Sequence, residues 1–156
     1  MAGVTASAGT VARRRWMSVL ALAPADELAA ATRRALPAPP RYRVLRGPET
    51  GLAMVRARAG GTGTRFNLGE TTVTRCTVQL EDGGGVGHAY VRGRDGRHAE
   101  IAALLDALLQ DPAYRPRLED AVVAPLERAH AERRHAAAAR AACSRVEFFT
   151  LVRGEG

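Results

Sequence analysis

The chain has 156 residues, of which 46% are hydrophobic and 25% are charged, and this composition is typical of a folded protein with a single core. No apolar run approaches the roughly 20 residues that a transmembrane helix needs, so we expect a soluble protein. All 23 side chains of the Lys and Arg class are arginines, and the net charge of +7 favours a phosphate-bearing ligand, a nucleic acid or an acidic protein as partner.

Two short helices are predicted near the N-terminus. Trp16 and Leu20 recur at the spacing of one helix face, and Pro24 ends that helix. A second helix is expected over residues 24–36, because its early acids and late arginines complement the helix dipole. The proline-rich residues 37–40 then form a stiff spacer. The N-terminal region is therefore predicted to be a helical hairpin.

After residue 41 the hydrophobic period changes to two, which predicts an antiparallel β-meander. The first two strands, residues 41–46 and 52–60, are expected to be joined by a turn at GPETG. Strands at residues 71–80 and 86–92 follow, with the turn-forming stretch EDGGG between them. We expect a sheet of about four strands with one buried face and one arginine-lined face.

The C-terminal part is predicted to contain helices and a last strand. Leucines dominate a continuous apolar stripe over residues 101–109, and Asp95 suits the N-cap position of that helix. The stretch DPAYRP interrupts, and a helix restarts at Pro125 and runs through the alanine-rich residues 126–142. Its thin apolar face favours packing on another large surface, such as a partner. Residues 146–151 alternate in polarity, as a strand would.

The predicted fold class is therefore α+β: an antiparallel meander of about four strands plus a C-terminal strand, flanked by an N-terminal helical hairpin and by C-terminal helices. Residues 1–10 are small and polar, which predicts a disordered tail rather than a secretory signal, and residues 11–156 are expected to form a single domain. Cys76 and Cys143 form neither a Cys-x-x-Cys motif nor half of a zinc site, so a reducing cytoplasm is the simplest setting. The sequence leaves a disulfide between them open.

The glycine-rich stretch AGGTGTRF is the first candidate for binding. It lacks the lysine and the following helix of a Walker loop, and a Rossmann fingerprint fails because the next segment is predicted to be a strand. Two interpretations remain. The backbone N–H groups of Gly60, Gly61, Thr62 and Gly63 could form an anion nest beside Arg65, or the glycines could only make a bend that needs positive φ.

The junction RGRDGRHAE is the second candidate. His98 and Glu100 have the spacing of the His-x-Glu motif of zinc nucleobase deaminases, but the Pro-Cys-x-x-Cys motif that completes such a site is absent. Either these residues lie in a first helical turn that faces solvent or a partner, or Arg92, Arg94, Asp95 and His98 line a polar pocket. Catalytic residues remain unassigned, and we expect the chain alone to bind no metal or cofactor.

Nucleic-acid binding is less favoured than the charge alone would indicate. Arg56, Arg58 and Arg75 are predicted to share one strand face, which could be a solvated surface. Bases are held by stacking as well as by charge, and aromatic residues are only 4% of this chain. A stand-alone basic module that binds nucleic acid or anionic ligands remains an alternative function.

Several stretches taken in order resemble the G subunit of the bacterial carbon–phosphorus lyase system, the PhnG family. They are RRRWMSVLA, DELAA, RARAGGTGTRFNLGE, TVTRC, VRGRDGRHAE and SRVEFFTLVRG. The likeness extends from about Arg13 to Gly154 and shows no departure at these motifs. The alanine-rich helix is too generic to compare.

This resemblance implies a cytoplasmic, multisubunit complex for organophosphonate catabolism. With the H, I and L subunits, the family converts ATP and methylphosphonate to ribose 1-methylphosphonate 5-triphosphate and expels adenine, while the J subunit cleaves the carbon–phosphorus bond. The implied partners are the H, I, J and L subunits, with the I subunit closest, and neither nucleic acid nor membrane. ATP is then a substrate of the complex, and the G subunit has no established catalytic residue.

From this resemblance we expect the glycine-rich stretch and the junction at residues 92–100 to face the partner that holds ATP. Arg65 and Arg94 are then the expected phosphate contacts, because a guanidinium binds phosphate oxygens in pairs. The isolated chain is expected to be inactive.

Overall fold

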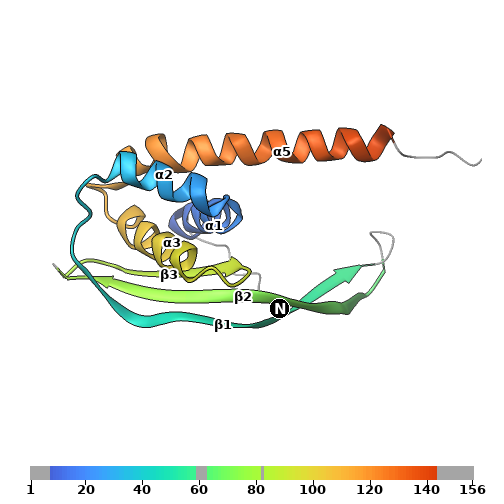
Figure 1. The fold of residues 1–156 in the computed structure, drawn as a ribbon, viewed down its shortest axis with the longest axis horizontal. Coiled ribbons are helices and arrows are strands. Elements are labelled where there is room, and N and C mark those ends of the chain that lie inside the picture. The colour runs from blue at the N-terminus through green and yellow to red at the C-terminus, as the bar shows by residue number, and fades with distance from the viewer. Residues whose placement is uncertain (1–7, 59–62, 82, 144–156) are drawn as a thin grey trace, which may run out of the picture.

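The computed structural model describes residues 8–58, 63–81 and 83–143. A three-stranded antiparallel sheet in the order β1-β2-β3 is covered on one face by helices (Figure 1), so the predicted α+β class is confirmed. The sheet has one strand fewer than the predicted meander. The C-terminal strand predicted at residues 146–151 lies outside the described residues, as do residues 1–7 of the predicted tail.

The predicted N-terminal helical hairpin is confirmed as α1 (Ala8–Leu22) and α2 (Ala25–Ala35). Helix α1 begins at Ala8, so the end of the predicted tail is helical and the three arginines at 13–15 lie in its second turn rather than its first. Pro24, predicted to be the first residue of this helix, is instead the N-cap of α2, and its φ of −58° is the value that the proline ring imposes. Acids in the first turn and arginines in the last turn of α2 complement its dipole.

The sheet consists of β1 (Tyr42–Arg58), β2 (Arg65–Leu80) and β3 (Val86–Arg92). The predicted turn at GPETG is wrong, because β1 continues through it and pairs with β2 on both sides. The register shifts between Arg46 and Glu49, where one extra residue is accommodated as a bulge. Glycine and proline are tolerated there because β1 is an edge strand, where a missing N–H leaves no ladder bond unmade.

The observed strand pairing also differs from the prediction in which residues share a face of the sheet. Arg75 lies opposite Glu49 and bonds its carboxylate at 2.8 Å on the exposed face of the sheet. Thr74, one residue earlier, is buried under the helices and lies opposite Thr50. Arg56 has the same strand parity as Thr50, so it lies on the other face from Arg75. The predicted arginine face that joined them is therefore wrong.

The first two strands extend far beyond the third. β3 reaches only to Val73 of β2, so residues 51–58 and 65–72 project as a two-stranded arm. All of these residues are exposed or half-buried. We call this segment the hairpin arm. The predicted buried face is confirmed in β2 and β3, whose alternate residues are buried, but β1 has no fully buried residue.

Helix α3 (Gly96–Leu109) is the centre of the fold, and its predicted N-cap is confirmed because Asp95 accepts a bond from the N–H of His98 at 2.9 Å. Ten of its fourteen residues are buried, since the sheet lies on one side of it and the other helices lie on the other. It approaches β3 at Gly87, where a Cβ would collide with the carbonyl of Ala103. Only glycine permits this contact between backbones.

The C-terminal helix begins earlier than predicted. The chain forms α4 (Arg115–Leu118), a π-helical turn η2 (Glu119–Val123) and α5 (Ala124–Cys143) without a break, so the predicted restart at Pro125 is wrong. The N–H of Ala124 bonds the carbonyl of Glu119, five residues back. This wider turn relieves the clash that a proline makes with the carbonyl four residues before it.

Helix α5 is attached to the body only by its first half. Leu126 is its one buried residue, and Glu127 bonds Arg15 at 2.6 Å. This guanidinium holds the pKa of the Glu127 carboxyl below its usual value. Farther along, Arg133 bonds Glu27 of α2. Every residue from 131 to 143 is exposed, and the half of α5 beyond Arg133, residues 134–143, extends roughly 15 Å at about 1.5 Å per residue. We call residues 134–143 the free half of α5.

Candidate functional site

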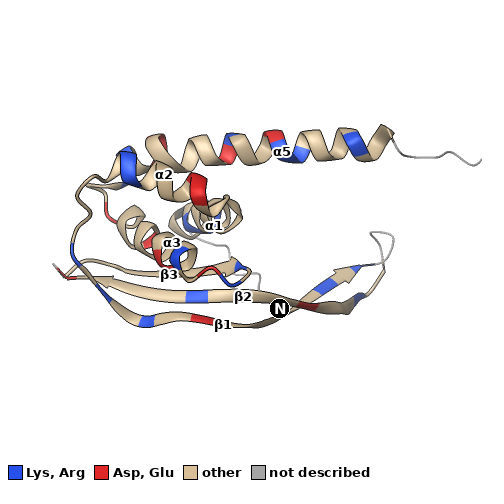
Figure 2. Cartoon of the chain, in the orientation of Figure 1, with Lys and Arg blue, Asp and Glu red and all other residues tan. Residues whose placement is uncertain are grey.

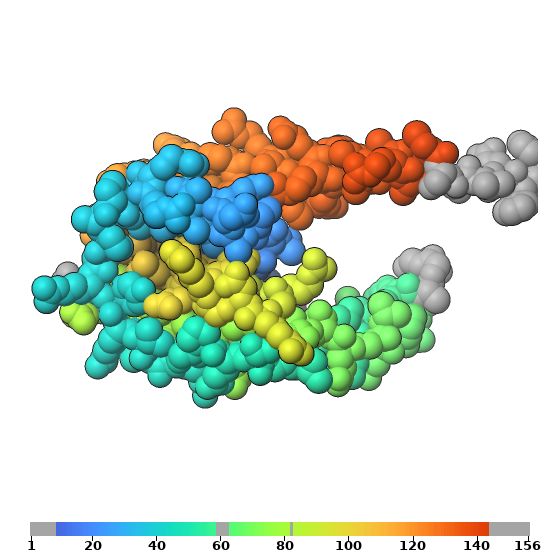
Figure 3. Space-filling view, viewed as in Figure 1, coloured from blue at the N-terminus to red at the C-terminus, as the bar shows by residue number. Residues whose placement is uncertain are grey.

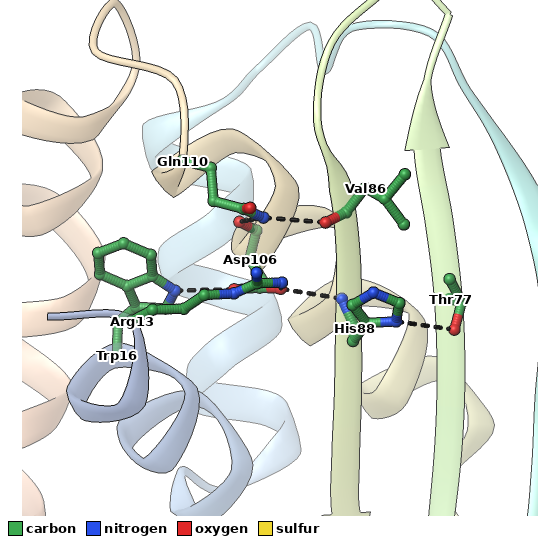
Figure 4. Close-up of polar contacts among 7 residues, drawn as sticks. All are labelled: Arg13, Trp16, Thr77, Val86, His88, Asp106 and Gln110. Carbon is green, nitrogen blue, oxygen red and sulfur yellow. Dashed lines mark hydrogen bonds and ion pairs between the residues drawn. The ribbon is translucent and has the colours of Figure 1, made fainter. Parts of the chain in front are cut away.

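A buried carboxylate joins the helices to the sheet. Asp106 of α3 is fully buried, and its Oδ1 accepts bonds from Arg13 Nε at 3.1 Å and Trp16 Nε1 at 2.9 Å. Its Oδ2 accepts from Arg13 Nη2 at 2.7 Å and from the backbone N–H of His88 at 2.9 Å. Figure 4 shows these donors converging from α1 and β3. We call this set the Asp106 cluster.

The Asp106 cluster is a structural contact. Four donors satisfy the two carboxylate oxygens, and no lone pair of good geometry is left for a substrate proton or a metal ion. Arg115 lies over the Trp16 ring at 5.4 Å from its centre, which covers the cluster on the helix side. Sequence reasoning missed this residue, although one signal was present: a single acid inside the apolar stretch IAALLDALL requires a buried partner.

The β3–α3 junction is held by backbone geometry. Gly93 has φ +98°, and its carbonyl accepts a bond from Thr74 Oγ1 at 2.7 Å. The N–H of Gly93 bonds the carbonyl of Thr72 at 2.9 Å. The turn therefore needs glycine for its left-handed backbone, and it fixes the start of α3 against the middle of β2.

His98 does not face solvent or a polar pocket, so both sequence interpretations of this residue are wrong. It is buried, and its Nε2 donates to the carbonyl of Leu20 at 2.8 Å. Asp95 is exposed but its carboxylate caps the helix. Helix α1 covers His98, so this first-turn residue is part of the interior. No local sequence pattern predicts such a long-range contact.

The other junction residues point in different directions. Arg92 and Arg94 are exposed, and neither has an ion pair within the described part of the chain. Glu100 is half-buried and accepts a bond from Tyr42 Oη at 2.8 Å. Burial, and then this bond to a carboxylate, raise the pKa of Tyr42 to about 12. Arg92 and Arg94 are thus exposed, whereas His98 and Glu100 make contacts within the fold.

A cavity of about 320 Å³ lies between α2, the linker after it and α3. Its polar lining includes Tyr42, Glu100 and the exposed Arg33 and Arg97. Leucine, isoleucine and proline side chains line it as well. Two guanidiniums beside apolar side chains suit a small organic anion. No spacing in the sequence indicates this cavity, because its lining depends on how α2 packs on α3.

The described part of the glycine-rich stretch, from Gly63 on, lies at the end of the hairpin arm. Gly60, Gly61 and Thr62 lie outside the described residues, whereas Gly63 and Arg65 are described and exposed. Arg65 is seven residues along β2 from Thr72, which contacts the β3–α3 junction, so the distance is roughly 23 Å at about 3.3 Å per strand residue. The two candidate regions therefore do not form one compact site.

The family model described as "Phosphonate metabolism protein PhnG" matches residues 11–154 of the chain. The chain belongs to this family. A curated relative, the alpha-D-ribose 1-methylphosphonate 5-triphosphate synthase subunit PhnG of Rhizobium meliloti (strain 1021), is 47% identical over 148 residues, which cover 95% of this chain and 93% of the relative. The resemblance found in the sequence is thereby confirmed.

The residues that the family model matches include the Asp106 cluster, the hairpin arm and α5. In residues 8–58, 63–81 and 83–143 no three metal-binding side chains come together. No helix in the same residues is long and apolar enough to cross a membrane. Both cysteines are free thiols: Cys76 is buried, and Cys143 is exposed at the end of α5.

Proposed function

We propose that this PhnG-family chain is a subunit of a ribose 1-methylphosphonate 5-triphosphate synthase and acts in organophosphonate catabolism. The observation that carries this proposal is the 47% identity with a relative that has this name, over nearly the full length of both chains. The assembled enzyme would transfer the ribose triphosphate of ATP to methylphosphonate and release adenine. ATP would be a substrate of the assembly, and this chain alone would hold no cofactor.

The contacts that the polar side chains make within the fold support an accessory role for this chain. Asp106 is saturated by four bonds, Asp95 caps α3, His98 is buried against Leu20 and Glu100 bonds Tyr42. These acid–base groups are engaged in holding the fold. A subunit of this kind would act by shaping and completing a neighbour's site.

The proposed partners are the H, I, J and L subunits of the carbon–phosphorus lyase system, and the I subunit is the proposed nearest neighbour. We place the assembly in the cytoplasm, where ATP is available. Arg65 and Arg94 remain the proposed phosphate contacts. Because roughly 23 Å of strand separates the two regions, they would act at two places on the partner surface.

Co-purification of the tagged chain with its cognate H, I, J and L subunits tests the proposal. We expect a hetero-oligomer that persists in high salt, because subunit interfaces bury apolar surface that salt does not screen. A chain that stays monomeric in the presence of all four subunits would overturn it. Nucleic-acid binding that falls steeply with salt would instead support the alternative of a stand-alone basic module.

The Arg65→Ala and Arg94→Ala variants test the phosphate contacts. Arg41→Ala is a matched control, because Arg41 is also exposed but lies outside both candidate regions. We expect the first two variants, once assembled at saturating subunit concentrations, to release adenine more slowly from ATP and methylphosphonate. If both variants matched the control, the assignment of these two arginines would be wrong.

A further inference from the structure

The hairpin arm and the free half of α5 project from the body in the same direction. The space-filling view shows an open hollow between them (Figure 3). The arm consists of residues 51–58 and 65–72, and the free half of α5 consists of residues 134–143. Two strands without a third, and a helix without a neighbour, are marginal structures in water. Both projections would be stabilised by a shared partner.

The face of the hairpin arm that continues the buried face of the sheet carries exposed apolar side chains. Leu52 and Met54 lie on it opposite Thr72 and Glu70, on the same side as the buried Thr74. Leu68 is the extra residue of β2 at the register shift between Val55 and Arg56. The exposed fractions of Leu52, Met54 and Leu68 are 65%, 51% and 63%. The layer of helices ends before it reaches these side chains, so the core-facing side of the sheet is left uncovered.

The end of the same face is basic. Arg58 lies directly opposite Arg65, and Arg56 has the same strand parity as Arg58. Like charges in directly opposed positions destabilise a strand pair unless a counter-charge is present. None of these three arginines has an ion pair within residues 8–58, 63–81 and 83–143. The hairpin arm therefore presents an apolar middle and a basic end that lacks its anion.

The free half of α5, on the other side of the hollow, also presents small apolar and basic side chains. Arg133 bonds Glu27 of α2, so its face of α5 is the one turned toward the body. Ala137 and Arg140 follow on that face, one and two turns farther along. Arg140 is exposed and carries no ion pair within the described residues. Figure 2 shows basic positions on both projections.

We propose that the hairpin arm and α5 clamp an element of a different subunit of the synthase, apolar along its middle and acidic where it meets the arginines. This inference rests on the proposed function. A second copy of this chain is disfavoured, because it would bring the same arginines together. Nucleic acid is disfavoured as well: bases stack on aromatic rings, and the one aromatic residue of the hairpin arm, Phe66, lies opposite Ala57 on the other face.

The test is titration of the purified complex of the remaining cognate subunits with full-length variants of this chain. Leu52→Glu and Met54→Glu are expected to weaken binding at least about tenfold, because each adds an unpaired carboxylate beside Glu70 on the face that contacts the partner. Val55→Glu is the matched control: Val55 lies on the opposite face and is also exposed. It should change binding less than twofold. Circular dichroism of each free variant verifies folding.

Charge reversal provides a second arm of the test. Arg58→Glu should weaken binding and reduce its salt dependence, whereas Arg41→Glu, at the other end of the sheet, should do neither. Amide hydrogen exchange gives a reading without mutation. Residues 51–58 and 65–72 should exchange rapidly in the free chain and become protected in the complex.

The outcomes separate the possible occupants. If wild type binds and the Leu52 and Met54 variants bind equally well, the clamp is wrong while the proposed function stands. Protection of the hairpin arm in the free chain that is lost when residues 144–156 are deleted would assign the surface to the chain's own end and overturn the clamp. A homodimer broken by Leu52→Glu would overturn it in favour of a second copy. Failure of the wild-type chain to bind at all would overturn the proposed function itself.

Discussion

Arg13 of α1 and Asp106 of α3 form a two-point ion pair across 93 positions of sequence, with 2.7 Å between Nη2 and Oδ2. The carboxylate is fully buried and also binds the indole of Trp16 and the backbone N–H of His88. One side chain thus connects α1, α3 and β3. Its role explains why a charged residue is kept inside the most apolar helix of the chain.

Removal of this carboxylate should be strongly destabilising. Asp106→Ala leaves the guanidinium of Arg13, the Trp16 indole and the His88 amide without their acceptor, and we expect the free energy of unfolding to fall by about 3–5 kcal/mol. Arg14→Ala is the control, because Arg14 is exposed and has no ion pair within the described residues, so its effect should stay within about 0.5 kcal/mol. Urea unfolding followed by tryptophan fluorescence measures both. Equal midpoints for the two variants would refute the structural role.

Gly87→Ala should disrupt the contact between β3 and α3. The added methyl group would collide with the carbonyl of Ala103 and would lie 2.5 Å from the N–H nitrogen of Ala107. Backbone cannot move aside as a flexible side chain would, so we expect a loss of about 3 kcal/mol or more. Gly51→Ala is the matched control, since nothing lies within 4 Å of its added Cβ. Thermal unfolding of both proteins measures the difference, and a Gly87→Ala protein as stable as the control would show that this close approach is absent.

Tyr42 should make stability fall at high pH. Burial and the bond to Glu100 raise the pKa of Tyr42 from 10.0 to about 12, so the native state keeps a proton that the unfolded chain loses. The stabilisation is complete below pH 10 and is lost as the pH rises toward 12. Tyr42→Phe should therefore lose less stability than wild type between about pH 10 and about pH 12. Tyr90→Phe, at a position 60% exposed, should behave like wild type. Identical pH profiles for wild type and Tyr42→Phe would contradict the assignment.

The two thiols should react at very different rates. Cys143 is exposed, whereas Cys76 is buried, and burial raises the pKa of its thiol and so lowers the fraction of reactive thiolate. With the thiol reagent DTNB we expect Cys143 to react at once and Cys76 only after unfolding. Cys143→Ser should abolish the fast phase. A native chain in which neither thiol reacts would instead indicate a disulfide.

Local patterns predicted the helices better than the sheet. The apolar stripe of α3 and its Asp95 cap follow from interactions within a few residues, and both are confirmed. The predicted turn at GPETG failed because its composition suits a turn, but the partner strand continues and an edge bulge accommodates Gly47 and Pro48. Strand pairing is decided by residues far away in sequence, which composition does not reveal.

In the candidate site, too, the features that depend on long-range contacts were not predicted from local patterns. Position in a first helical turn suggested that His98 faces outward, but α1 covers it and Leu20 provides its acceptor. The cavity between Arg33 and Arg97 depends on how two helices pack, so no spacing in the sequence indicates it. Asp106 was detectable in principle, because burying an acid requires a partner, but the sequence alone does not select Arg13 from three neighbouring arginines.

The central claim is that this chain works only as part of a synthase, and adenine release measures it most directly. ATP and methylphosphonate are incubated with the complete set of cognate subunits, with the set lacking this chain, and with this chain alone, and free adenine is measured by chromatography. We expect free adenine to be released only by the complete set of subunits. Adenine release by the chain alone, or undiminished release by the set that lacks it, would contradict the account.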